Sequence, residues 1–178
     1  KIMFSETVAS CDFQESQHTK ALIEILQLRA DRKLLHNNLI ISIPPGHTKT
    51  LLCNILYCSW ILGKYPHLRQ LLGTNSQTEG NKRNLELRDL MQSDKYKNIF
   101  PNVFLTGEDV KWLKTNHKGG RLAVTTDVAM RFTGTDADEL IIDDPNDTTS
   151  TLIEFEKVKD WFDKKAKRRL RRGNLGFL

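Results

Sequence analysis

The chain has 178 residues, which is enough for one sizeable domain with its own core and too few for two. Its composition, 39% hydrophobic and 28% charged, is that of a soluble globular protein. No stretch approaches the roughly 18 consecutive apolar residues that a membrane-spanning helix needs, and the polar N-terminus does not resemble a signal peptide. The net charge of +5 is local, because seven of the 27 basic residues lie within residues 164–172.

Residues 1–16 are polar and lack periodicity, so we expect a lead-in segment before a domain that spans residues 17–178. From residue 17 to residue 28, apolar side chains recur with a helical period. The apolar, branched run at residues 39–43 predicts a buried parallel strand. The sequence Pro44-Pro45-Gly46 ends this run, and residues 50–62 resume helical spacing.

The second half of the chain continues this alternation of strands and helices. Residues 68–74 predict a second strand, and residues 76–92 a charged amphipathic helix. Residues 111–116 and 121–126, joined through Lys118-Gly119-Gly120, predict a hairpin. Residues 139–142 form another apolar run, which leads into two acidic residues.

A long C-terminal helix is predicted to begin at Thr151, because Thr151 and Glu154 have the spacing of a capping box. Its apolar stripe comprises Phe155, Val158, Phe162, Ala166 and Leu170. Strands that alternate with helices indicate an α/β domain with a mostly parallel sheet.

The three cysteines, Cys11, Cys53 and Cys58, show no spacing typical of a metal site. Cys53 and Cys58 fall on a predicted apolar helix, where buried reduced thiols are expected. This predicts a reducing, cytoplasmic environment.

The tight turn after residues 39–43 has features of a phosphate-binding loop. Such loops surround a phosphate with backbone N–H groups at a helix N-terminus, while a lysine reaches the β/γ oxygens and a hydroxyl binds magnesium. Lys49 and Thr50 occupy those two places between a predicted strand and a predicted helix. The candidate nucleotide-binding residues are Pro45, Gly46, His47, Thr48, Lys49 and Thr50. The alternative is a plain strand-to-helix turn with an exposed lysine.

The loop departs from the pattern G-x-x-x-x-G-K-[ST] at both glycine positions, which hold Ile43 and Thr48. If the backbone at residue 48 needs a positive φ, a β-branched threonine costs about 1–2 kcal/mol there.

Asp143 and Asp144 follow the apolar run at residues 139–142. Ligands bind at the carboxyl ends of parallel strands, where Lys49 and this acidic pair are both expected. Asp143 would share a magnesium ion with Thr50, and Asp144 would orient or deprotonate the attacking water. The alternative is a pair of turn-forming acids before Pro145. Arg131 is a further candidate catalytic residue, for contact with the γ-phosphate, or else an ordinary surface arginine.

Several ordered segments resemble the N-terminal ATPase domain of the large terminase subunits of tailed bacteriophages, over about residues 13–172. The family carries a helix with a histidine, an apolar strand and then Pro-Pro-Arg-His-Gly-Lys-Ser. The similar segments here are His18, residues 39–43, residues 44–50, residues 60–66, residues 93–101, residues 133–145, Trp161-Phe162 and Arg169-Leu170.

The resemblance implies a P-loop NTPase of the RecA-like (ASCE) kind, with three αβα layers and a mostly parallel central sheet. It implies a magnesium-dependent ATP hydrolase that packages double-stranded DNA into a procapsid in the cytoplasm of a bacterial host. Its implied partners are DNA, the portal, the small terminase subunit and further copies of itself, with no membrane. Lys49 and Thr50 correspond to the phosphate and magnesium residues, Asp143 to the Walker B acid and Asp144 to the catalytic carboxylate.

Three departures from the family leave other functions open. Gly46 stands where the family often has an arginine, and Thr48 replaces the usual glycine. The sequence stops at Leu178, where the family would continue into its next core strand, its coupling motif and a nuclease domain, so the ATPase domain is expected to be incomplete at its C-terminus. One alternative is a degenerate prophage remnant that keeps the fold without turnover. Another is a different P-loop DNA motor, related to helicases or recombinases.

The basic residues near the C-terminus have two interpretations. They would either contact DNA phosphates or form the solvated face of an amphipathic helix. This group comprises Lys164, Lys165, Lys167, Arg168, Arg169, Arg171 and Arg172.

Overall fold

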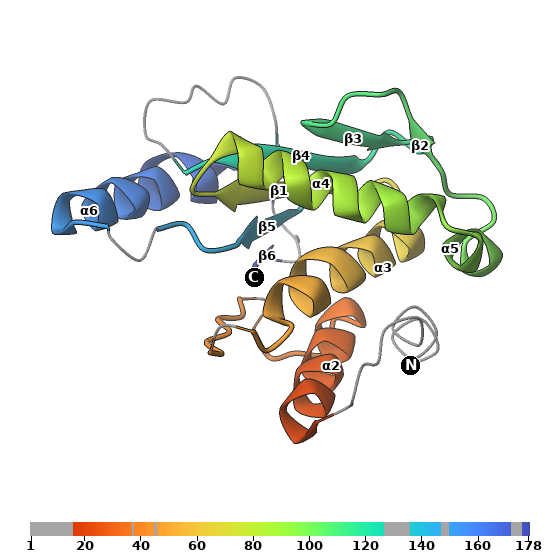
Figure 1. Cartoon of the computed structure of the whole chain (residues 1–178), viewed down its shortest axis with the longest axis horizontal. Coiled ribbons are helices and arrows are strands. Elements are labelled where there is room, and N and C mark those ends of the chain that lie inside the picture. The colour runs from red at the N-terminus through yellow and green to blue at the C-terminus, as the bar shows by residue number, and fades with distance from the viewer. Residues whose placement is uncertain (1–15, 37, 45, 127–135, 147–149, 172–175) are drawn as a thin grey trace.

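The structure is a computed structural model that describes residues 16–36, 38–44, 46–126, 136–146, 150–171 and 176–178. Within these ranges, six strands form one sheet in the order β2-β3-β4-β1-β5-β6 (Figure 1). Strands β4, β1, β5 and β6 are parallel to one another, whereas β2 and β3 are antiparallel to their neighbours. The strands are β1 (Arg69–Thr74), β2 (Leu105–Thr106), β3 (Trp112–Thr115), β4 (Gly120–Thr125), β5 (Glu139–Ile142) and β6 (Gly176–Phe177).

The predicted α/β class is confirmed, but the sheet is mixed and not mostly parallel. The difference arises at one edge, where β3 and β4 form the predicted hairpin and β2 adds a second antiparallel pair. Glycine is required in this hairpin because Gly120 has a φ of +138°, and a Cβ atom there would lie 1.9 Å from the carbonyl oxygen of Leu113.

The predicted helices are present, and α2, α4 and α6 have capping side chains at their starts, whereas the helix that begins at Thr50 has none. Ser76 caps α4 through a hydrogen bond from the Glu79 backbone N–H, and Thr151 and Glu154 form the expected capping box of α6. The α-helices in the described ranges are α2 (Gln17–Ala30), α3 (Tyr57–Lys64), α4 (Gln77–Gln92), α5 (Asp94–Ile99) and α6 (Leu152–Trp161). A π-helical segment, Thr50–Leu56, leads into α3, and Phe162–Ala166 and Lys167–Arg169 extend α6 as π and 3₁₀ turns.

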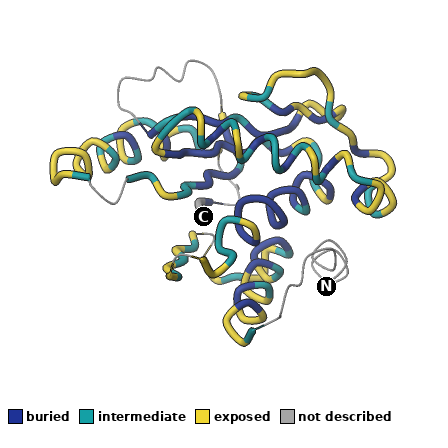
Figure 2. Tube along the Cα trace, viewed as in Figure 1, coloured by how far each residue is buried: buried dark blue, intermediate teal, exposed yellow. Residues whose placement is uncertain are grey.

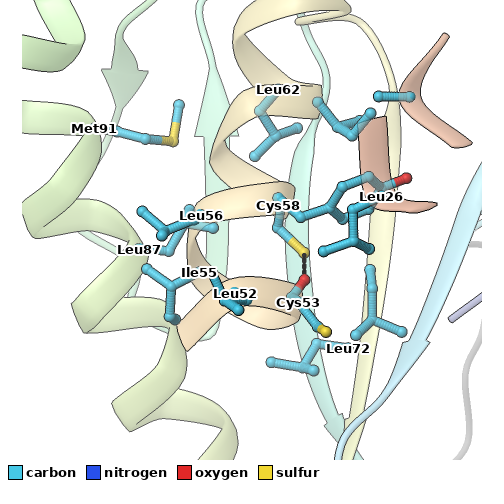
Figure 3. Close-up of a cluster of buried hydrophobic side chains, with 14 of the residues drawn as sticks. Leu26, Leu52, Cys53, Ile55, Leu56, Cys58, Leu62, Leu72, Leu87 and Met91 are labelled. Carbon is cyan, nitrogen blue, oxygen red and sulfur yellow. Dashed lines mark hydrogen bonds between the residues drawn. The ribbon is translucent and has the colours of Figure 1, made fainter. Parts of the chain in front are cut away.

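Buried side chains cover both faces of the sheet. On one face, Leu72, Ala123 and Ile141 join a large cluster built with the helices of residues 17–64 and with α4. Figure 3 shows the centre of this cluster, with residues from the Thr50–Leu56 turn and α3 between Leu26, Leu72 and Leu87. On the other face, a smaller cluster brings α6 and the turn after it against the sheet and comprises Leu71, Val124, Ala137, Leu140, Trp161 and Ala166.

Exposure follows from these layers. The sheet and the helix faces toward it are buried, whereas the beginning of α6 is exposed (Figure 2). Cys53 and Cys58 are free and buried, as predicted, and the Cys58 thiol donates to the backbone oxygen of Cys53. No helix in the described ranges combines the length and the apolar character needed to cross a lipid bilayer.

The prediction of a buried parallel strand at residues 39–43 is wrong. Leu39, Ile41 and Ile43 pack against the large core cluster, but Ile40 between them is 86% exposed. In the part of the chain that the structure describes, this segment belongs to no strand. A branched apolar run becomes a strand only where a neighbouring strand offers partners for its backbone hydrogen bonds, and the local pattern does not encode such a neighbour.

Candidate functional site

The loop before the π-helical segment Thr50–Leu56 has a left-handed backbone at two positions. Gly46 has a φ of +79° and Thr48 a φ of +59°. The carbonyl oxygen of Thr48 then accepts from the backbone N–H of Leu52 at 2.9 Å, which begins the helix. The sequence-based concern about Thr48 therefore applies, because a β-branched residue holds a conformation that favours glycine.

Lys49 lies beside the acidic pair at the end of β5. Its Nζ donates to Oδ1 of Asp144 at 2.7 Å, although 95 residues separate the two in the chain. Burial by itself would lower the pKa of Lys49, but the hydrogen bond and negative charge of Asp144, together with the charge of Asp143, raise it above its ordinary value. The lysine is therefore held in its cationic form at the mouth of the loop.

Asp143 is the more buried acid, with 11% of its side chain exposed. Its backbone N–H donates to the carbonyl oxygen of Gly73, which ties it to the end of β1. Its Oδ2 accepts from Nδ2 of Asn54 at 3.0 Å, and Nε of Arg83 lies 4.0 Å from the same oxygen. Asp144 points instead toward solvent, with 69% of its side chain exposed and a φ of +44°.

The oxygen atoms at this site fit a magnesium ion that is shared with phosphates. Magnesium takes one or two carboxylates and fills its remaining positions with phosphate oxygens and water. Within the described ranges, no group of three or more His, Cys, Asp or Glu side chains could hold a metal by itself. The half-buried Thr50 forms no side-chain hydrogen bond with any described residue, so its hydroxyl is available as an oxygen ligand.

The outer side of the loop is open. A Cβ atom added to Gly46 would meet no heavy atom within 4 Å, which leaves room above the backbone. Nδ1 of His47 donates a hydrogen bond to the carbonyl oxygen of Pro44 at 3.2 Å. Its ring also makes an edge contact with His18 of α2, with 5.3 Å between ring centroids.

A cavity of about 480 Å³ adjoins the site. Lys49, Asn54 and Asp143 form its polar end, while residues 39–41, Ile142 and one side of α6 contribute most of its apolar wall. The cavity therefore extends from Lys49 of the candidate phosphate loop to the end of β5, where Asp143 lies.

Three of the predicted site residues, Pro45, Arg131 and Arg172, lie outside the described residues. The other basic residues near the C-terminus lie on or after the turn that follows α6. Lys164, Lys167, Arg168 and Arg171 are exposed, and Lys165 and Arg169 are half-buried. Lys164 pairs with Asp160 at 2.6 Å and Arg171 with Asp138 at 3.2 Å, so part of this charge is neutralised.

Sequence reasoning missed three polar residues around Asp143, namely Asn54, Arg83 and Arg121. Asn54 and Arg121 are buried, and each lies in an apolar stretch of helix or strand without a recognisable motif. The signal that could have found them is the presence of a costly polar group at a position whose pattern calls for an apolar one.

Replacing Thr48 with glycine is expected to stabilise the fold by roughly 0.5–1 kcal/mol. Relief of the left-handed strain gains about 1–2 kcal/mol, and the extra freedom of glycine in the unfolded chain costs about 0.5–1 kcal/mol. Denaturant titration measures the difference. Thr50→Gly is the matched control, since Thr50, the first residue of the helical segment, has no positive φ and glycine there should bring no gain in stability. A loss of stability in Thr48→Gly would contradict the strain argument.

A scan against protein-family models and a search of curated proteins each gave no match for this chain.

Proposed function

We propose that this chain binds ATP and magnesium as a P-loop NTPase domain. The observation that carries the proposal is the 2.7 Å contact between Lys49, at the start of a helix, and Asp144, at the carboxyl end of the parallel strand β5. A nucleoside triphosphate requires a cationic group for its phosphates and acids for its metal ion. A lysine at a helix start and two acids at the end of a parallel strand supply these groups.

The proposed roles follow the positions of the side chains. Lys49 contacts the β/γ-phosphates, while Thr50 and Asp143 hold the magnesium ion. Asp144 and Lys49 neutralise each other in the structure described here. A phosphate at Lys49 would replace Asp144 as its partner and would leave this carboxylate free to orient the attacking water.

The wider proposal is the ATPase of a terminase large subunit, which drives double-stranded DNA into a procapsid. It rests on the family-like segments of the sequence, and an α/β sheet with helices on both faces is compatible with it. The proposed partners are DNA, the portal, the small terminase subunit and further copies of the chain, in a bacterial cytoplasm. The exposed Lys164, Lys167, Arg168 and Arg171 would contact DNA phosphates.

A second candidate is a domain that binds nucleotide without hydrolysing it. The positive φ of Thr48 favours this candidate, because a side chain replaces the usual glycine close to the phosphates. Gly46 stands where related motors carry an arginine that would stabilise the transition state. Another P-loop DNA motor, such as a helicase or recombinase, is the remaining alternative.

Titration calorimetry with ATP in the presence and absence of magnesium tests the proposal. We expect a dissociation constant below about 1 mM that depends on magnesium, within the range common for enzyme substrates. Absence of any binding heat at millimolar ATP would contradict the proposed function. Phosphate release with and without double-stranded DNA then separates the two candidates, because only a working motor gives DNA-stimulated turnover.

A further inference from the structure

Asn54 connects the helix of the candidate phosphate loop to Asp143. Asn54 lies in the same π-helical segment, Thr50–Leu56, as the predicted magnesium ligand Thr50, and only 1% of Asn54 is exposed. Its Nδ2 donates to Oδ2 of Asp143 at 3.0 Å. Oδ1 of Asp143 has no hydrogen-bond partner among the described residues, so it is the oxygen available to a cation.

Arg121 fixes which way the Asn54 amide faces. Its Nη1 donates to Oδ1 of Asn54 at 2.6 Å and to the Asn54 backbone oxygen at 2.7 Å. An arginine can only donate hydrogen bonds, so the amide oxygen must face Arg121 and the amide NH₂ group must face Asp143. The orientation of Asn54 is therefore set by chemistry and not by a choice between two equivalent flips.

Arg121 is itself an unusual residue for the centre of a sheet. It lies on β4 and is fully buried, and its other hydrogen bonds go to Asn84 Oδ1 at 2.8 Å and the Arg83 backbone oxygen. None of these acceptors is a carboxylate. Burial lowers the pKa of Arg121, while Cys58 and Asp143 act in the opposite direction. A buried cation without a direct anionic partner is costly, which calls for a reason for its presence.

We propose that Asn54, held in place by Arg121, is a positioning residue that fixes Asp143 with one carboxylate oxygen directed to a divalent cation. This inference rests on the proposed nucleotide site. Partners that orient a metal ligand from behind typically contribute 10- to 100-fold to metal affinity. Asn54 would thus act through Asp143 and would touch neither the nucleotide nor the metal.

The test compares the magnesium dependence of ATP binding in two Asn54 variants. Asn54→Ala removes the donor to Asp143 and the side-chain acceptor of Arg121, and Asn54→Leu removes the same two groups but keeps most of the side-chain volume. Both variants keep the backbone oxygen of residue 54 that accepts from Arg121. We expect each variant to weaken the apparent magnesium affinity at fixed ATP by about tenfold or more. Binding of ATP in excess EDTA, which depends on Lys49 and the loop, should change by less than about twofold in the variant that retains the fold.

Asn84→Ala is the matched control. It removes another acceptor of Arg121 within the same buried network, but Asn84 does not contact Asp143. It should lower the thermal midpoint and leave the magnesium affinity unchanged. Wild-type magnesium affinity in a folded Asn54→Ala or Asn54→Leu variant would overturn this inference alone. Absence of ATP binding by the unmodified protein would overturn the proposed function and this inference with it.

Discussion

Lys49→Ala is expected to weaken ATP binding roughly 10- to 100-fold, because a charge-assisted hydrogen bond to phosphate is worth about 1.5–3 kcal/mol and each 1.4 kcal/mol changes affinity tenfold. The fold should survive the change. The Lys49–Asp144 pair is partly open to solvent, with 27% and 69% of the two side chains exposed, so it adds at most about 1 kcal/mol to stability. Titration calorimetry measures the affinity, and thermal unfolding checks the fold.

Lys64→Ala is the matched control for this experiment. Lys64 belongs to α3, which continues from the Thr50–Leu56 turn, and it pairs with Asp31 at 2.6 Å. Its exposure of 33% is close to that of Lys49, so the two variants lose a similar charge and a similar surface ion pair. ATP affinity should be unchanged in Lys64→Ala. Equal affinity in both variants would show that the loop is not the phosphate site.

The juxtaposition of Lys49 with the acidic pair was predictable from sequence. Both lie next to short apolar runs, and the carboxyl ends of parallel strands meet at one edge of a sheet. For Asp143 and Asp144 this reasoning holds, because β5 is a strand between β1 and β6. Lys49 reaches the same edge although the run before it is not a strand. The predicted position of Lys49 beside the acids is therefore correct, although the strand predicted at residues 39–43 is not.

The incorrect strand prediction shows that a local sequence pattern does not identify the pairing partner of a strand. Residues 39–43 have a strand composition, but pairing depends on a partner elsewhere in the chain. Helix starts such as Ser76 and Thr151 were easier, because a cap needs only residues within one turn. Asn54 and Arg121 were out of reach for the same reason as the missing strand. A polar residue in an apolar stretch marks each position, but the contact joins residues 67 positions apart, so the local pattern does not identify the partner.

A buried polar cluster at the beginning of β5 contributes to stability and was not predicted from the sequence. Arg29 of α2 and Glu139 of β5 form an ion pair in which 1% and 0% of the side chains are exposed. The Tyr57 hydroxyl accepts from Arg29 and donates to Glu139 at 2.9 Å. Gln70 Nε2 donates to the second carboxylate oxygen at 2.8 Å, so both oxygens of Glu139 have a partner.

The charges in this cluster depend on each other. Burial by itself would lower the pKa of Arg29, but the charges and hydrogen bonds of Glu139 and Tyr57 together outweigh it and the pKa is raised. Burial and the nearby Glu139 charge raise the pKa of Tyr57 well above its ordinary value, so this hydroxyl stays protonated and can donate. Removing the carboxylate would leave the guanidinium buried without a counter-charge.

Glu139→Ala is therefore expected to lower the free energy of unfolding by about 3–5 kcal/mol, the cost of leaving one partner of a buried pair uncompensated. This is a large share of the 5–15 kcal/mol that is common for a folded domain. Denaturant titration at constant pH gives the value, provided that the slope of the transition stays the same. Glu79→Ala is the control, since Glu79 pairs with Arg83 at 3.3 Å on the exposed side of α4 and should cost less than about 0.5 kcal/mol.

Restoring neutrality separates a lost charge from lost packing. The double variant Arg29→Met with Glu139→Ala also removes the guanidinium that Glu139→Ala leaves without its counter-charge, so its stability should exceed that of Glu139→Ala alone. If the double variant is instead the less stable of the two, the Arg29 stem contributes through packing and not through its charge. Because β5 runs from Glu139 to the residue before Asp143, destabilising its start would also loosen the acids of the candidate site. ATP affinity should therefore fall in Glu139→Ala and recover partly in the double variant.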